Sequence, residues 1–426
     1  MYKRQKLKSK GITEIKDLFA NGIPTLKSER LFELLAHPDQ RVRQRAQFAL
    51  ADQDLDSLPL FEKAIKPNQP LMRRIHGIWG IGQLGQKNPS ALNSLASLIG
   101  DKEMEVRANL ARTLGNHGKH LAPFRKALIA MLDDSSPRVV SLAAIALSNH
   151  GHKDAIEPAI KMLENNDDND VVVRHAGIMV LTKCGEFTTD WKHYDHRSSA
   201  VRRAIVIALR RHKSHLLETY FGDRDQSVRQ EAIRAAYEMD VRKTYRALSN
   251  QAHSIALRVS PEIKWHPLTA RRAIFAAWVL GQEKDAEVIA KIAADPKVDF
   301  RTRKDALIAL LEWNNPPVPD PVTGFARTLP KNRIKLNSSI VENLKGLLDG
   351  VDKSSVELIP RALILSEQDQ IPLGELRLTR YLKNENFPEE ARVKSMKLLA
   401  SLKESNPTRP LTCLLYTSPS PRDLRK

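Results

Sequence analysis

The stretch "VRANLARTL" (residues 106–114) decides how this chain folds, because variants of it recur along most of the sequence. Within each copy, apolar residues fall near positions i, i+4 and i+8, which is the period of a helix face rather than of a strand. The clearest other copies are "VRQRAQFAL" from Val42, "VVSLAAIAL" from Val139, "VRHAGIMVL" from Val173, "VRRAIVIAL" from Val201 and "VRQEAIRAA" from Val228, with weaker ones from Thr302 and Ala391.

The spacing of the copies predicts a repeated pair of helices. The copies from Val106, Val139 and Val173 follow one another at 33 and 34 residues, and "LMRRIHGIWGIGQLG" fills the double interval before Val106. A polar turn and a second short apolar stretch precede each copy, as in "FRKALIAMLDDSS". One such helix pair cannot bury its apolar face alone, whereas stacked pairs can. We therefore predict an all-α fold, an α-solenoid of about eleven helix pairs.

Proline content sets the expected boundaries within this solenoid. The stretch "WNNPPVPDPVTGFARTLPKNR" (residues 313–333) has five prolines and no helical period, and proline breaks a helix because it lacks an N–H donor. A loop of this length is either functional or flexible. We expect a lead-in segment at 6–25, a repeat array at 26–313, a Pro-rich loop at 314–333 and further helical repeats at 334–412.

An acidic turn followed by Val-Arg at the start of the second helix resembles HEAT repeats. Arginines at this position can bridge to the aspartates of a neighbouring turn, so we expect a structural ladder along the stack rather than a binding site. The residues predicted to form this ladder are Asp39, Arg43, Asp101, Arg107, Arg174, Arg202, Asp225 and Arg229.

Four stretches resemble one family more closely: "LLAHPDQRVRQRAQFALA", "RRIHGIWGIGQLG", "SSAVRRAIVIALRRHKS" and "LEWNNPPVPDPVTGF". They look like the HEAT region of large bacterial membrane-bound dehydrogenases. That resemblance implies a quinoprotein-like β-propeller upstream, a c-type cytochrome domain downstream, and a periplasmic or cell-envelope location. Haem c and a quinone-type cofactor would then sit in the flanking domains. This chain contains no Cys-x-x-Cys-His motif, so no haem or catalytic residue of the family has a counterpart here.

Both ends of the chain resemble translated sequencing adapter. "MYKRQ" at the start and "CLLYTSPSPRD" from Cys413 match the two strands of a transposase mosaic-end element and its continuation. We therefore expect residues 1–5 and 413–426 to be artefact and the remainder to be an internal fragment of a longer gene. Removing those ends lowers the formal net charge of +18 to +14.

The basic charge raises the alternative of a nucleic-acid partner. Arg202, Arg203, Arg210, Arg211 and Lys213 could form a basic patch on a concave surface. Aromatic residues make up 5% of the chain and do not alternate with these basic residues, so a stacking platform for bases is missing. Nucleic acid is therefore the alternative, and flanking domains or other proteins are the expected partners.

Histidine pairs are the remaining chemical candidates. They lie in "NHGKH", "NHGH" and "HYDH", at His117, His150 and His193 with their neighbours. A metal would need further ligands that no Cys or carboxylate cluster supplies by spacing. Cys184 ends an apolar helix and reads as a small buried residue. In "GIWGIGQLG" we expect the glycines to permit close helix packing, because no strand precedes them as a phosphate loop requires.

The sequence as a whole thus predicts a monomeric, non-catalytic scaffold or spacer. We assign no catalytic, cofactor-binding or metal residue within it. No run of about eighteen apolar residues is present, so no membrane span is expected either.

Overall fold

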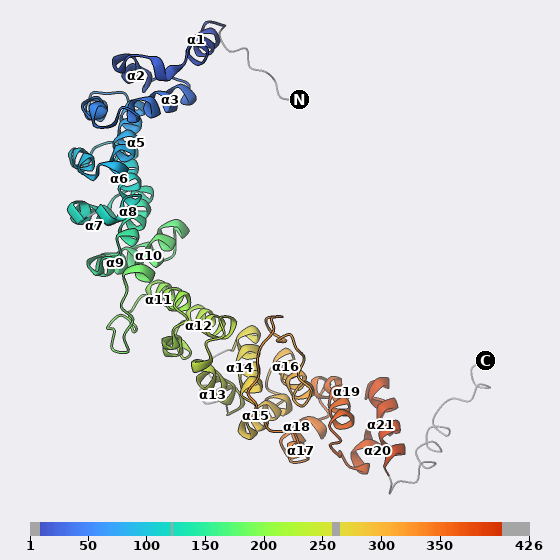
Figure 1. Ribbon diagram of the computed structural model, residues 1–426. Helices are drawn as coiled ribbons and strands as arrows, with labels where there is room; N and C mark the ends of the chain where they lie inside the picture. The colour runs from blue at the N-terminus through green and yellow to red at the C-terminus, as the bar shows by residue number, and fades with distance from the viewer. Residues whose placement is uncertain (1–8, 121, 258–264, 403–426) are drawn as a thin grey trace. The chain divides into compact units, whose positions relative to one another are not determined.

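The computed structural model describes residues 9–120, 122–257 and 265–402, and the adapter-like ends lie outside these ranges (Figure 1). Within them the regular secondary structure is helical, apart from one isolated bridge between Pro319 and Ala326. None of the described helices is both long and apolar enough to cross a membrane. The chain divides into two compact units, Met1–His212 and Lys213–Lys426.

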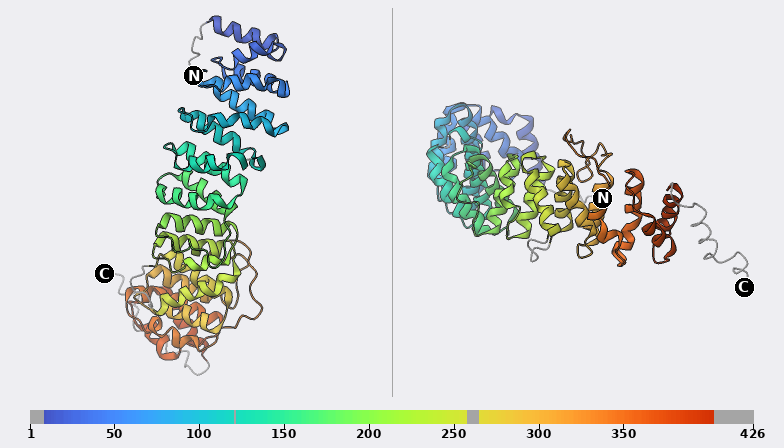
Figure 2. Two further views of the ribbon diagram at one scale, coloured as in Figure 1. Left: turned by 90° about the vertical axis from the view of Figure 1, so that its left-hand side faces the viewer. Right: turned by 90° about the horizontal axis from the view of Figure 1, so that it is seen from below.

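The first unit is a stack of helix pairs. Its second helices pack against one another in chain order, and the shorter first helices cover one side of them (Figures 1 and 2). The first helices are α2 (Ser28–Leu34), α4 (Leu58–Ala64), the 3-10 helix η3 (Pro89–Leu98), α7 (Arg125–Ala130) and α9 (Ile156–Asn166). The second helices are α3 (Gln40–Ala51), α5 (Leu71–Lys87), α6 (Met104–Gly115), α8 (Pro137–His150), α10 (Val171–Cys184) and α11 (Ser199–Arg211).

The second unit contains helix pairs of the same kind. Its second helices are α12 (Gln226–Glu238), α14 (Pro267–Leu280), α16 (Phe300–Leu311), α19 (Lys353–Gln368) and α21 (Glu389–Ser401), each packed on the next. Its first helices are η8 (His215–Tyr220), α13 (Tyr245–Leu257), α15 (Glu283–Ala294), the short α17 (Ile340–Asn343) with α18 (Lys345–Leu348), and α20 (Glu375–Lys383). The described residues therefore contain eleven second helices, and the predicted helical solenoid is confirmed.

The first valines of the repeated motif are buried, as its helical pattern predicts. The first valine of each of the six strong copies is at most 5% exposed, so these positions form the core between helices. Several of the second helices also begin at an acidic or hydroxyl cap. The side chains of Asp39, Asp170, Ser198, Asp225 and Asp299 each accept a hydrogen bond from a backbone N–H in the first turn, which satisfies donors that the helix leaves unpaired.

The irregular spacing after Val173 has a structural cause. The copies from Val201 and Val228 follow after only 28 and 27 residues. Before α11, the first helix is replaced by turns at residues 186–198, and before α12 it is reduced to the six residues of η8. A missing or shortened first helix thus shortens the spacing of the repeat.

The structure gives more detail for two of the expected segments. The lead-in segment is itself helical, with α1 (Ser9–Ala20) and the turn η1 (Ile23–Thr25). The segment without helix between α16 and α17 covers residues 312–339 and is longer than the predicted loop at 314–333. We refer to residues 312–339 below as the strap.

Candidate functional site

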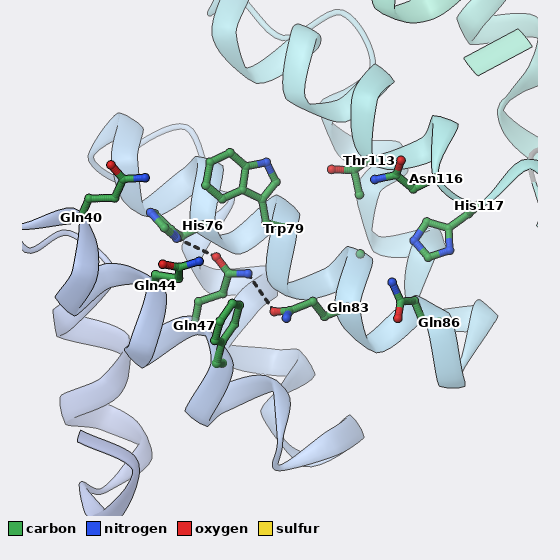
Figure 3. Close-up of a pocket in the computed structure, with 12 residues that line it drawn as sticks. Gln40, Gln44, Gln47, His76, Trp79, Gln83, Gln86, Thr113, Asn116 and His117 are labelled. Carbon is green, nitrogen blue, oxygen red and sulfur yellow. Dashed lines mark hydrogen bonds between the residues drawn. The ribbon is translucent and has the colours of Figure 1, made fainter. Parts of the chain in front are cut away.

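A groove of about 230 Å³ lies on the exposed face of α3, α5 and α6 (Figure 3). Its walls are dominated by side-chain amides and aromatic rings. The lining residues are Gln40, Gln44, Gln47, Phe48, His76, Trp79, Gly82, Gln83, Gln86, Thr113, Asn116 and His117. None of these side chains is a carboxylate, an ammonium or a guanidinium.

Helical periodicity places these residues on one surface. On α3, Gln40, Gln44 and Gln47 are three or four residues apart, so they share a face. On α5, His76, Trp79, Gln83 and Gln86 do the same over three turns. Because the second helices stack side by side, the amide faces of α3 and α5 adjoin, and α6 adds Asn116 at the far end (Figure 3).

Gly82 lines the groove, and Gly82 and Gly80 allow α5 to pack closely on its neighbours. A Cβ on Gly82 would lie 2.5 Å from Cγ2 of Thr113, and a Cβ on Gly80 would lie 2.1 Å from the Phe61 ring. Real Cβ atoms do not approach so closely, so both positions need glycine for the neighbouring elements to pack. The prediction that these glycines serve helix packing is confirmed.

A hydrogen-bond relay fixes the orientation of one wall. Arg43 Nε donates to His76 Nε2 at 3.1 Å, and His76 Nδ1 lies 2.7 Å from Gln47 Oε1. Gln47 Nε2 then donates to Gln83 Oε1 at 2.8 Å. Burial, together with the charge of Arg43, lowers the pKa of His76 to about 4, so the ring is neutral and its Nδ1–H is the donor. The relay therefore occupies the oxygen of Gln83 and leaves its NH₂ as the group available to a ligand.

Trp79 is held by the next repeat. Its indole Nε1–H donates to Asn109 Oδ1 at 3.1 Å, and Asn109 in turn donates to the Glu105 carbonyl at 2.7 Å. Its ring meets His76 edge to face at 4.9 Å between centroids. The N–H is thus used internally, and the partly exposed ring presents an apolar surface to the groove.

Four further amides in the groove have no internal role. Within the described part of the chain, the side chains of Gln40, Gln44, Gln86 and Asn116 form no hydrogen bond, and each is exposed. An amide carries two donors and an acceptor. The groove therefore offers an array of neutral donors and acceptors to whatever enters it.

The predicted arginine ladder has a more specific geometry than the sequence indicated. Arg107 contacts the Asp101 and Lys102 carbonyls of its own turn at 2.7 and 3.1 Å, and its guanidinium binds Asp134 of the next repeat at 2.7 and 3.0 Å. Asp101 binds Arg74 of the preceding repeat, and both side chains are less than 10% exposed. The inter-repeat acceptor is thus the aspartate that follows the arginine by 27 residues.

Other ladder residues also bind their own turns. Arg43, Arg202 and Arg229 each donate to a carbonyl six residues earlier, at His37, His196 and Asp223 respectively. Arg174 pairs with Asp168 of its own turn at 3.4 Å. Asp39 pairs with Arg41 rather than with Arg43, and Asp225 serves as a helix cap.

The predicted basic patch is smaller in the structure. Arg202 is 2% exposed and faces the interior, so it cannot contribute to a surface. Arg203 forms an ion pair with Asp168 across the repeat. Arg211 is exposed on α11, Arg210 is half-buried, and Lys213 begins the second unit.

The histidine pairs show no metal geometry. Among the described residues, no group of three or more His, Cys, Asp or Glu side chains could hold a metal ion. His150 and His152 stack with 5.8 Å between ring centroids, and His193 Nε2 lies 3.0 Å from Glu157 Oε1. Cys184 is buried, and that burial raises the pKa of its thiol to about 11, which opposes formation of a nucleophilic thiolate.

The strap is a second polar cluster, in the second unit. Tyr237 donates to Asp320 Oδ2 at 2.7 Å, and Arg327 Nε lies 3.2 Å from the same carboxylate oxygen. The Arg327 guanidinium lies 4.3 Å from the Tyr237 ring centroid and also donates to the Tyr245 hydroxyl. A loop that was expected to be functional or flexible is therefore anchored on α12 and α13.

A second arginine anchors the other half of the strap. The Arg333 guanidinium lies 5.0 Å from the ring centroids of both Trp278 and Trp313. It donates to the backbone carbonyls of Trp278, Val279 and Trp313. Burial lowers its pKa to about 10, so it remains charged at neutral pH.

Comparison with known proteins supports no particular activity. No family model matches the sequence, and no curated protein matches it. Among solved structures, importin beta covers 94% of this chain with 58% of its own length, at 12% identity and a TM-score of 0.43. A designed armadillo repeat protein covers 49% of the chain with 98% of its own length, at 18% identity and a TM-score of 0.30. Human deoxyhypusine hydroxylase covers 75% with 98% of its own length, at 17% identity and a TM-score of 0.24.

Sequence reasoning missed the groove. The glutamines of α3 and α5 are visible as "QRVRQRAQ" and "GQLGQ", but solvated polar positions on a helix have the same spacing. Glutamines that line a groove differ from solvated glutamines in having neighbouring helices beside them. Here these neighbours are set by the stacking of α3, α5 and α6, which the local sequence does not reveal.

Proposed function

We propose that this chain is a non-catalytic helical-repeat scaffold that binds a protein partner along the second helices of its first unit. The observation that carries the proposal is the groove on α3, α5 and α6. It combines a partly exposed aromatic ring with amides that the fold does not use, whereas the polar groups of the ladder and the strap are paired internally.

We further propose that the scaffold is an internal part of a dehydrogenase with a c-type cytochrome domain, located in the cell envelope. The four family-like stretches support this, from "LLAHPDQRVRQRAQFALA" to "LEWNNPPVPDPVTGF". The haem and the quinone-type cofactor would belong to flanking domains, because Cys184 and Cys413 cannot form a Cys-x-x-Cys-His site in this chain.

Sequencing the gene in both directions tests the second part of the proposal. A propeller upstream and a Cys-x-x-Cys-His motif downstream are expected. An open reading frame that lacks both would overturn the link to dehydrogenases while leaving the scaffold function in place.

Nucleic-acid binding has less support, since Arg202 is buried and Arg203 is paired. Binding by net charge alone should be weak and should vanish steeply with salt, because it rests on counterion release. A gel-shift titration at 50 and 200 mM salt distinguishes a protein-binding scaffold from a protein that binds nucleic acid. Tight binding that persists at the higher salt and is lost on changing Arg210 and Arg211 to Glu would favour the nucleic-acid alternative.

A further inference from the structure

We infer that the groove on α3, α5 and α6 binds an extended polypeptide segment of low net charge through its main chain. This inference rests on the proposed scaffold function and specifies the chemistry of the partner. It follows from the charge of the groove, the kind of polar groups it presents and the spacing of its helices.

The neutral lining of the groove offers no charge attraction to a phosphate-rich ligand. Although the chain carries a net charge of +18, none of the twelve lining residues is Lys, Arg, Asp or Glu. The buried His76 is neutral, and burial also lowers the pKa of His117. A peptide backbone is neutral and polar, so it matches the neutral polar groups of the groove.

The polar groups match the alternating character of a peptide chain. A peptide presents one N–H and one C=O per residue, so a partner must offer both acceptors and donors. Gln44, Gln86 and Asn116 supply both, and Gln83 offers its NH₂ because its oxygen is occupied by Gln47. Trp79 lies among these amides and offers an apolar face to one side chain of the peptide (Figure 3).

The spacing of the helices matches an extended conformation. Packed helices lie about 8–10 Å apart, and an extended chain advances about 3.3 Å per residue. A peptide that crosses α3, α5 and α6 would therefore meet a new helix about every three residues. A segment of about nine residues would cover the three helices.

The test begins with a probe of defined chemistry. A phage-displayed library of random linear dodecapeptides is selected on the immobilised full chain, and the most enriched peptide is synthesised with a fluorescein label. Fluorescence anisotropy then gives its dissociation constant at 50 and 200 mM salt. We expect enrichment of peptides of low net charge and similar affinity at both salt concentrations.

The groove is tested with a triple variant, Gln44→Ala, Gln86→Ala and Asn116→Ala. These side chains are exposed and make no hydrogen bond within the described residues, so the variant should fold, as circular dichroism can verify. Loss of three neutral hydrogen bonds should weaken binding by at least tenfold. The matched control is Asn165→Ala with Asn169→Ala, which removes exposed amides outside the groove and should leave the affinity unchanged.

The ligand side is tested by methylating alternate backbone nitrogens of the peptide. Recognition of the main chain predicts that the methylated peptide binds at least tenfold more weakly. Binding that is equal for the triple variant and the wild type, or unaffected by backbone methylation, would overturn the inference. So would displacement of the peptide by poly-uridine RNA, or failure of the library to enrich any peptide. The gene-flank test of the proposed function is independent of all these outcomes.

Discussion

The groove of the first unit and the strap of the second unit use similar residues in opposite ways. Both combine aromatic rings with polar side chains, and in each an aromatic side chain is held by a hydrogen bond. In the strap, Arg327 and Asp320 satisfy each other and the two tyrosines. In the groove, Gln40, Gln44, Gln86 and Asn116 remain free of any contact of this kind within the described residues. Polar groups that form no hydrogen bond or ion pair within the fold are the ones available to a partner.

The largest expected effect is on the strap. Arg327→Ala would leave the carboxylate of Asp320, which is 2% exposed, without its charged partner. Removing one member of a buried ion pair costs about 3–5 kcal/mol. Urea denaturation should show this loss for Arg327→Ala, whereas Lys331→Ala, an exposed change in the same strap, should be nearly neutral. Similar unfolding midpoints for both variants would show that the strap does not stabilise the second unit.

The next effect concerns the core of the first unit. Leu114 and Leu147 end the repeated motif and are each 1% exposed. Truncation of either to Ala should cost about 2–5 kcal/mol, through lost transfer energy and the cavity left behind. Leu376→Ala is the chemical control, because that side chain is 89% exposed. Thermal unfolding compares them, and equal shifts for all three would contradict the assignment of the motif to the core.

A smaller effect depends on pH. The pKa of His76 is lowered from an ordinary value of 6.5 to about 4 in the folded chain. Between these pH values, His76 is protonated in the unfolded chain and neutral in the folded chain. The free energy of unfolding should therefore fall as the pH falls from 6.5 to 4, by about 1–3 kcal/mol. His76→Gln should show a shallower decline over that range. If the two slopes were the same, His76 would not be the titrating group.

The smallest effect returns to the groove. Gln44→Ala removes an exposed amide that contributes no hydrogen bond within the described residues, so the free energy of unfolding should change by less than about 0.5 kcal/mol. Urea denaturation of this single variant beside Arg327→Ala measures the contrast between the two regions. A loss above 1 kcal/mol would show that the groove amides belong to the fold after all.

The row of second helices could be predicted from the sequence because its signal is local and repeated. The buried valines and the capping aspartates recur at nearly fixed spacing, so each copy supports the others. No copy of the motif was identified in two of the second helices. In α19, Pro360 interrupts the pattern, and in α14 the motif reads "ARRAIFAAW" without its Val-Arg start.

The groove and the strap could not be predicted because both depend on contacts between distant residues. Gln47 meets Gln83 only when α3 and α5 stack, and Arg327 meets Tyr237 across a separation of 90 residues. The same limit applies to the basic patch. Arg202 and Arg203 are adjacent in sequence, but consecutive helical residues point in different directions, and only one of the two lies at the surface.

The strap also affects the order of events during synthesis. In a simple repeat stack each helix pair needs only its neighbours, so it can fold soon after it leaves the ribosome. Tyr237 instead forms its contacts with Asp320 and Arg327 only after these residues have been synthesised, 83 and 90 residues later. At translation rates of about 5–20 residues per second, that interval is roughly 5–20 s. For that time the two tyrosines of the nascent α12 and α13 lack the strap contacts that they have in the finished protein.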